Sequence, residues 1–183
     1  MSDNGLLKLR DFKNLKPANN NLVFRKHTKK FLIKENSDVV WNMYKNIPPK
    51  DAWNGSMVSF GLQYSRRQDK LTYNEDHYSG MEKGQIIFLH LNIYGLLSLA
   101  VAHEVTEVNE VEKFFTTTYM EHGKSAGTQH VQINATKEGY TEIIHKTLYK
   151  SDSPFRDKIL YPTLHTKAIS EFHANVKRKV IAL

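Results

Sequence analysis

The C-terminal segment, residues 153–183, carries the longest regular pattern of apolar positions in the chain. Ser153 and Pro154 form a helix start, because serine is a good N-cap and proline suits the first helical position. Apolar residues then recur every three or four positions: Phe155, Ile159, Leu160, Leu164, Ala168, Phe172, Val176 and Val180. The pattern predicts a helix of about 28 residues, roughly 40 Å long, with a kink near Pro162.

The chain before this segment is predicted to consist mostly of β-strands. Apolar, β-branched and aromatic residues fall between turn residues at 22–34, 57–65, 70–73, 84–91, 96–106, 113–121, 126–136 and 140–150. The connections between the last strands are short, which implies antiparallel neighbours. Strands and helices do not alternate along the chain, which argues against a parallel sheet of βαβ units.

A short helix is expected directly after the first strand. Ser37 is the predicted N-cap, and apolar residues follow at helical spacing: Val39, Val40, Met43, Tyr44 and Ile47. Pro48 and Pro49 end this helix, and residues 50–53 add a further turn.

The first twenty residues differ in composition from the rest of the chain. They are polar and end in a stop signal at Pro17 and residues 19–21. Their apolar residues, Leu6, Leu7, Leu9, Phe12 and Leu15, have the spacing of a short amphipathic helix that docks on the body, and disorder is the alternative. We therefore expect a partly ordered or disordered extension over 1–20 and a single domain over 21–183.

The segment from Gly84 to Ala102 is apolar enough to require a test for membrane insertion. Its length matches that of a membrane span. However, Gln85, His90 and Asn92 lie within it and would be costly in hydrocarbon. The residues that follow Asn92 have the composition of a turn, so two buried strands in a hairpin are the preferred interpretation.

The charge of the chain allows two interpretations. The net charge is +7, and clusters at 25–30 and 177–179 supply much of it. Such clusters suit a nucleic-acid or anionic-membrane surface, but they equally suit a solvated edge strand and a helix end. No nucleic-acid-binding motif accompanies them, so we expect no nucleic-acid partner. The chain contains no cysteine and its first sixteen residues lack a signal-peptide core, which predicts a cytoplasmic protein.

Three features of the sequence occur together: the helix start at 35–41 (ENSDVVW), the strands after Gly84 and the terminal helix that contains Pro162. In these features the sequence resembles the superfamily of START and Bet v 1-type proteins, which includes polyketide cyclases and aromatases. Residues 115–133 also resemble a passage in an uncharacterised bacterial family of that superfamily.

The resemblance implies an α+β, helix-grip fold. In that fold a curved antiparallel sheet of about six to seven strands wraps around the long C-terminal helix, with one or two short helices after the first strand. It also implies a hydrophobic cavity between sheet and helix that binds a lipid, a polyketide or a similar metabolite. Fold alone does not establish function.

The chain contains nine histidines, and no established catalytic motif accompanies them. Those in the later predicted strands are His90, His103, His130 and His145. A metal site would need two or three of them on one face, and their spacing does not indicate one. We therefore expect no metal and no cofactor, and we assign no catalytic residue.

Strand alternation gives the predicted binding residues. In 96–106, His103 shares an apolar face with Leu99 and Val101, and this face should point toward the helix. His103 would then lie at the cavity edge, either to bind a ligand or to bond to a backbone group. In 126–136, His130 lies opposite Gln129 and is expected to face outward. The predicted cavity residues are Trp53, Tyr64, His90, Leu99, Val101, His103, Tyr119, Leu164, Ala168 and Phe172.

Three functions follow from these observations. The first is binding of a small apolar ligand by a monomer or homodimer. The second is a cyclase- or hydratase-type enzyme in the same cavity, with His103, Tyr64, His90 or Glu121 as acid or base. The third is a basic surface for nucleic acid or anionic lipid. The sequence favours the first.

Overall fold

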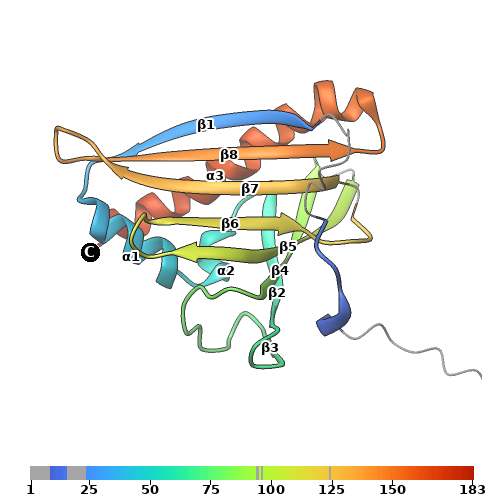
Figure 1. Ribbon diagram of the computed structural model, residues 1–183, viewed down its shortest axis with the longest axis horizontal. Helices are drawn as coiled ribbons and strands as arrows, with labels where there is room; N and C mark the ends of the chain where they lie inside the picture. Colours follow the sequence, from blue (N-terminus) through green and yellow to red (C-terminus); the bar gives the residue numbers. More distant parts are fainter. Residues whose placement is uncertain (1–8, 16–23, 94, 96, 124) are drawn as a thin grey trace, which may run out of the picture.

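The computed structural model describes residues 9–15, 24–93, 95, 97–123 and 125–183, and its main element is an eight-stranded antiparallel sheet. The strand order is β1-β8-β7-β6-β5-β4-β2-β3 (Figure 1). The strands are β1 (Arg25–Ile33), β2 (Val58–Ser65), β3 (Lys70–Thr72), β4 (Gln85–Ile93), β5 (Leu97–Asn109), β6 (Phe114–Tyr119), β7 (Ser125–Ala135) and β8 (Thr141–Ser151). All the predicted strands are confirmed to within a few residues.

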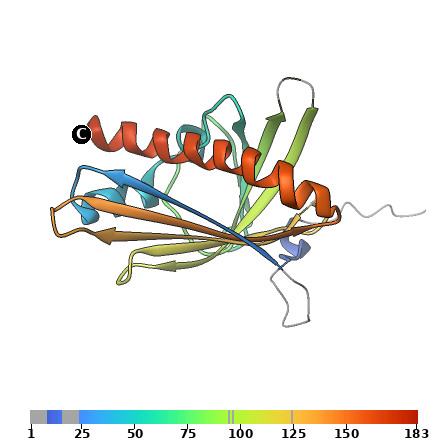
Figure 2. The same cartoon turned by 90° about the horizontal axis from the view of Figure 1, so that it is seen from above.

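The long helix α3 (Tyr161–Ile181) crosses one face of this sheet, as Figure 2 shows from above. Two short helices, α1 (Ser37–Asn46) and α2 (Pro49–Ala52), follow β1. The cap of α1 is Asn36 rather than the predicted Ser37, since the Asn36 side chain accepts from Asp38 N at 2.7 Å. The α+β, helix-grip architecture inferred from the sequence is therefore correct.

The first part of the C-terminal helix differs from the prediction. Residues Arg156–Leu160 form a π-helical turn, η2, directly before Pro162, which has no N–H to donate within a helix. The wider turn breaks the regular spacing, so Phe155, Ile159 and Leu160 are exposed by 62%, 52% and 43%. Only the later part of the predicted apolar face is core: Ala168, Phe172, Val176 and Val180.

The inner face of the sheet, which faces α3, carries the main core. One cluster joins Val40, Trp41 and Tyr44 of α1 to Phe172 of α3 and Val131 of β7. A second cluster joins β4 and β5 to Ala168. Two register shifts, at Phe60/Leu62 and Val105/Glu107, interrupt the ladders of β2 and β5, and such bulges bend and twist a sheet.

An N-terminal segment, residues 9–15, lies on the outer face of the sheet. It begins with the 3₁₀ helix η1 (Leu9–Asp11), and its Leu9 and Phe12 pack against Tyr64, Ile86 and Met120. Leu15 N donates to Tyr119 O at 2.7 Å, and Glu121 N donates to Lys13 O at 2.8 Å. The docking predicted from Leu9, Phe12 and Leu15 is thus seen as a short 3₁₀ turn and an extended stretch, whereas Leu6 and Leu7 lie outside the described residues.

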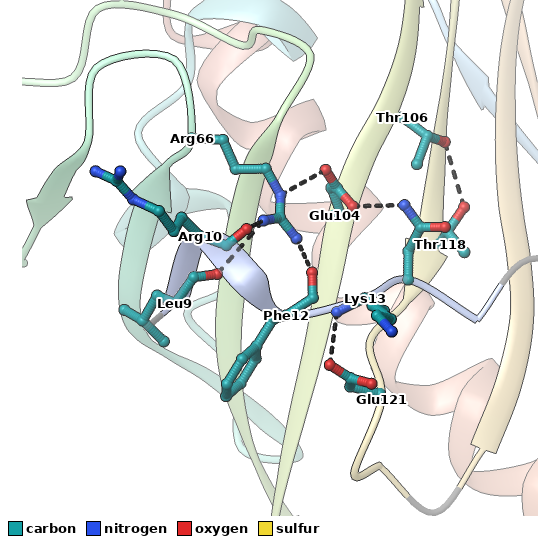
Figure 3. A network of polar contacts seen from close by, with 10 residues as sticks. Leu9, Arg10, Phe12, Lys13, Arg66, Glu104, Thr106, Thr118 and Glu121 are labelled. Atoms are coloured by element: carbon teal, nitrogen blue, oxygen red, sulfur yellow. Dashed lines mark hydrogen bonds and ion pairs between the residues drawn. The ribbon is translucent and has the colours of Figure 1, made fainter. Parts of the chain in front are cut away.

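Arg66 of the β2–β3 turn fixes this N-terminal segment (Figure 3). Its Nε donates to Glu104 Oε1 at 2.9 Å, and its terminal nitrogens donate to the carbonyls of Leu9, Arg10 and Phe12. The carbonyl of Leu9 also accepts from Phe12 N at 3.3 Å, whereas those of Arg10 and Phe12 lie near the end of η1, where helical donors run out. The other Glu104 oxygen accepts from Asn14 Nδ2 at 2.7 Å, so the Arg66–Glu104 pair joins three parts of the chain.

The basic cluster 25–30 and the apolar segment 84–102 have structural explanations. The cluster lies on β1, which is an edge strand of the sheet, as one of the two interpretations predicted. The apolar segment contains β4 and most of β5, which pair from Ile86↔Glu104 to Ile93↔Leu97, so the hairpin prediction is confirmed. No helix in the described part of the chain is long and apolar enough to cross a membrane.

The contribution of α3 to the core can be measured with two phenylalanines of the C-terminal segment. We expect Phe172→Ala to lower the free energy of unfolding by about 3–5 kcal/mol, because it removes a buried ring. Phe155→Ala should change it by less than about 1 kcal/mol, because that side chain is exposed. Urea denaturation of both variants tests this, and equal effects would contradict the packing described here.

The Arg66–Glu104 pair offers a second matched test. Arg66→Met leaves the Glu104 carboxylate, which is 10% exposed, without its ion partner, and we expect a loss of about 2–3 kcal/mol. Arg67→Met removes a neighbouring arginine that is 73% exposed, and it should cost no more than about 0.5 kcal/mol. Unfolding in urea again gives the comparison, and a null effect of Arg66→Met would show that the N-terminal segment is held in another way.

Candidate ligand-binding site

A small cavity lies between the inner face of the sheet and the helices. Its volume is about 40 Å³. Apolar and aromatic side chains form most of its wall, among them Tyr44, Trp53, Ile87, Leu89, Val105, Phe115, Val131 and Phe172. Its remaining polar lining comes from His103, Thr117, Gln129 and His145. This volume holds a few water molecules and is far below the ~300–1,000 Å³ of typical ligand pockets.

The cavity is smaller than the one expected from the sequence because side chains fill the space. The indole of Trp53 stacks on the ring of Phe172 with centroids 4.3 Å apart. Tyr78 and Met81, from the loop between β3 and β4, form another part of the wall. A ligand-sized space therefore requires that some of these side chains move.

Polar side chains form a continuous chain of hydrogen bonds beside the cavity. Tyr44 Oη lies 2.5 Å from His173 Nδ1, and His173 Nε2 lies 2.9 Å from His145 Nδ1. His145 Nε2 lies 2.8 Å from Gln129 Oε1. Gln129 Nε2 in turn lies 3.2 Å from His103 Nδ1 and 3.4 Å from its Nε2. We call this set, Tyr44–His173–His145–Gln129–His103, the interior hydrogen-bond chain.

The interior hydrogen-bond chain joins elements that are far apart in sequence. Tyr44 comes from α1, His173 from α3, and the others from β8, β7 and β5. Gln129 Nε2 also donates to Tyr119 Oη at 3.4 Å, and the Tyr119 hydroxyl bonds to that of Tyr161 at the start of α3. The interior hydrogen-bond chain, extended through Tyr119, therefore links the start and the middle of α3 to the sheet.

The direction of each hydrogen bond follows from Gln129. Because its Oε1 faces His145, the Nε2 of His145 must donate, and its Nδ1 accepts from His173. His173 Nδ1 then accepts from the Tyr44 hydroxyl. The Gln129 amide nitrogen only donates, so His103 accepts from it at one ring nitrogen and carries its own hydrogen on the other.

Burial keeps the histidines of the interior hydrogen-bond chain neutral. It lowers the pKa of His103 to about 4 and that of His173 to about 3, because a charged imidazole is poorly solvated there. The pKa of His145 is also well below its ordinary value, through burial and then through neighbouring histidines. Burial raises the pKa of Tyr119 to about 12, so its hydroxyl keeps its proton at neutral pH.

A second, shorter set of hydrogen bonds lies beside the first. The Thr166 hydroxyl donates to Pro162 O at 2.6 Å, so it accepts from His27 Nε2 at 3.0 Å. His27 Nδ1 then accepts from His165 Nδ1 at 3.3 Å. These bonds tie β1 to α3, and each ring again has one donor and one acceptor.

The structure brings three of the predicted cavity residues to the cavity wall: Trp53, His103 and Phe172. Tyr119 lies one step away, through Gln129. Leu99, Val101, Leu164 and Ala168 lie on the same side of the sheet, outside the cavity lining.

Tyr64 and His90 lie on the other side. Tyr64 packs in the outer cluster and donates to Asp69 Oδ1 at 2.5 Å. His90 is exposed, and Glu121, proposed as an acid or base, accepts from Lys13 N at 2.7 Å. Of the four acid–base candidates, the structure thus places only His103 at the cavity.

Tyr44, Gln129, His145 and His173 were not among the site residues predicted from the sequence, although the sequence contains a signal for two of them. Gln129 shares a strand face with Val131 and Ile133, which are both buried. His145 similarly shares a strand face with buried Ile143. A polar residue on a strand face that is otherwise apolar is the signal. His130, in contrast, faces outward beside Thr116 and Phe114, as expected.

The histidines are not arranged as a metal centre. Gln129 separates His145 from His103, and His145 bonds directly to His173. In the described ranges, no group of three or more histidine, cysteine, aspartate or glutamate side chains is placed to hold a metal ion.

Neutral buried histidines make stability depend on pH. Their pKa values are lowered in the folded state, so the unfolded chain takes up protons first as the pH falls below about 6.5. We expect each such histidine to lower the free energy of unfolding by about 2 kcal/mol when the pH falls from about 7 to about 5. His103→Asn should therefore lose about 2 kcal/mol less over this range than the wild type does.

Urea denaturation at the two pH values gives this difference. His90→Asn is the control, since His90 is exposed and on the neighbouring strand, and it should follow the wild type. An unchanged pH dependence in His103→Asn would mean that His103 is not buried in its neutral form.

Comparisons with known proteins agree on the fold. No model of a known protein family matches the chain, and no curated protein sequence does. Among solved structures, major latex-like protein 151 from Panax ginseng aligns with a TM-score of 0.61 at 12% identity, over 86% of this chain and 98% of its own. The KanY protein aligns with a TM-score of 0.61 at 14% identity, over 87% and 99%.

A third similar structure contains ligands. Norcoclaurine synthase from Thalictrum flavum, in complex with dopamine and hydroxybenzaldehyde, has a TM-score of 0.64 at 12% identity, covering 100% of this chain and 95% of its own. Identities this low show a shared fold and nothing of function. The chain thus has the helix-grip fold of the Bet v 1-like proteins.

Proposed function

We propose that this protein binds a small, mainly apolar molecule, such as a lipid, a polyketide or a similar metabolite, between the sheet and α3. The observation that carries the proposal is the cavity itself. An aromatic and aliphatic wall meets neutral polar groups of His103, Gln129 and Thr117 on one side. A few polar groups in an otherwise apolar space are typical of small-molecule sites.

Access to this space would come from the loop between β3 and β4, residues 73–84, which we call the gate loop. Its Tyr78 and Met81 line the cavity, while most residues from 73 to 79 are exposed. Met81 N donates to Lys45 O at 2.7 Å, and Gln85 Nε2 donates to Gly80 O at 2.8 Å. Gly80 has a φ of 102°, a conformation that favours glycine, and suits a hinge. Displacing Tyr78 and Met81 would enlarge the cavity.

The similar structures support this proposal to the extent that their titles allow. Norcoclaurine synthase holds small aromatic molecules on the same fold. At 12% identity, no residue role can be transferred from it to this chain.

An enzyme of the cyclase or hydratase kind is the alternative function. It is favoured by the histidines of the cavity wall, His103 and His145, because histidine is the side chain that most often serves as general acid or base. Catalysis would require a second polar group within reach of the same ligand atom. A molecule extracted from the purified protein can then be added back to it. Its chemical conversion would favour the enzyme, and its retention without change would favour a binding protein.

Finer assignments from the sequence remain predictions. They are the relation to an uncharacterised bacterial family, the cytoplasmic location, the division into 1–20 and 21–183, and a monomeric or homodimeric state. The ligand-binding role of the predicted residues belongs with them.

Native mass spectrometry of the freshly purified protein, followed by solvent extraction, tests the proposed function. We expect a bound apolar molecule, and binding of the neutral fluorescent probe N-phenyl-1-naphthylamine by protein from which it has been removed. Thr117→Phe should weaken probe binding about tenfold or more, because the ring fills the cavity.

Thr116→Phe is the matched control, since its side chain lies on the opposite face of β6 and contacts His130. It should bind the probe like the wild type. An empty protein that fails to bind the probe would overturn the proposal, and salt-sensitive binding to nucleic acid or anionic lipid would then be the function to examine.

A further inference from the structure

The interior hydrogen-bond chain contains one more donor than its own acceptors can take up. His103 accepts from Gln129 Nε2 at one ring nitrogen. The other ring nitrogen, which carries the hydrogen, lies within 3.4 Å of the same amide nitrogen, which cannot accept, so this N–H has no acceptor among the described residues. His103 is only 7% exposed and lines the cavity. A buried donor without an acceptor costs about 1–3 kcal/mol.

Rotating the Gln129 amide does not remove this surplus. The rotation would turn Gln129 Oε1 toward His103 and would reverse every link as far as Tyr44. The Tyr44 hydroxyl would then accept from His173 and keep its own hydrogen uncommitted. Tyr44 also lines the cavity, so an uncommitted donor borders the cavity in either arrangement.

The cavity offers nothing to balance a charge. Within the described part of the chain, no lysine, arginine, aspartate or glutamate lines it. Burial lowers the pKa of the lining histidines His103 and His145 and raises that of the lining tyrosines Tyr44 and Tyr78, so all four side chains are neutral at pH 7. An anion placed there would lose its hydration without gaining an ion partner.

We infer that the ligand presents a neutral hydrogen-bond acceptor, with a carbonyl oxygen as the simplest case, to the free N–H of His103, and that carboxylates are rejected. The inference rests on the proposed function and names its ligand class. The apolar body of the ligand packs against Trp53 and Phe172, and its oxygen completes the interior hydrogen-bond chain. A hydrocarbon of the same shape leaves the N–H unpaired and binds more weakly.

Three compounds of nearly equal size separate these possibilities. Acetophenone carries the ketone, cumene replaces its oxygen by a methyl group, and benzoate carries a carboxylate. Each is titrated against N-phenyl-1-naphthylamine bound to the wild-type protein at neutral pH. We expect acetophenone to displace the probe at about tenfold lower concentration than cumene, and benzoate to be at least about a hundredfold weaker than acetophenone.

Variants assign the preference to His103. His103→Phe keeps a ring of similar size and removes the N–H, so acetophenone and cumene should then bind alike. His90→Phe, with its exposed side chain on the neighbouring strand, should keep the wild-type preference. Nitrogen-15 NMR of wild-type protein serves where His103→Phe does not fold: acetophenone should shift the His103 ring N–H signal and cumene should not.

The outcomes distinguish this inference from the proposed function. Equal binding of acetophenone and cumene by the wild type, or benzoate binding as tightly as acetophenone, overturns the inference while probe binding still supports the function. A ring N–H signal that does not respond to acetophenone also overturns it. Failure of the probe and of all three compounds overturns the proposed function and the inference together.

Discussion

Polar side chains in the space between the sheet and α3 must find their hydrogen-bond partners inside the protein, and this constraint determines how the molecule is assembled. Tyr44, His173, His145 and Gln129 satisfy one another only if α1, α3, β8 and β7 hold their observed positions. Apolar packing alone would tolerate small shifts of α3, since hydrophobic contacts have no direction. Hydrogen bonds between rings of fixed orientation do not tolerate such shifts, and they therefore set the position of the helix relative to the sheet.

The outer face of the sheet supports the same region from behind. Residues 13–15 pair with the chain near Tyr119 and Glu121, at the end of β6. Tyr119 is the residue through which Gln129 reaches Tyr161. The N-terminal segment, held by Arg66, thus restrains the backbone of a residue whose side chain belongs to the interior. The two faces of the sheet are coupled through β6.

The sequence was sufficient for the architecture because its elements are long and regular. The alternation in 96–106 placed His103 and Val105 on the inner face, and helical spacing placed Phe172 and Val176 in the core. The exposed Phe155 was misassigned because the π-helical turn before Pro162 interrupts that spacing. The partners of His103 were not predictable, since Gln129, His145 and His173 meet only through tertiary packing. The size of the cavity could not be predicted either, because it depends on how Trp53 and Tyr78 fill the space.

The common direction of the hydrogen bonds in the interior chain has an electrical consequence. Each link has its donor on the Tyr44 side and its acceptor on the Gln129 side, so the small dipoles of these links follow one another head to tail. Such a row polarises itself, and its field is little screened in a medium of low dielectric constant. The interior of this protein therefore carries a built-in polarity whose sign is set by the orientation of a single amide, that of Gln129.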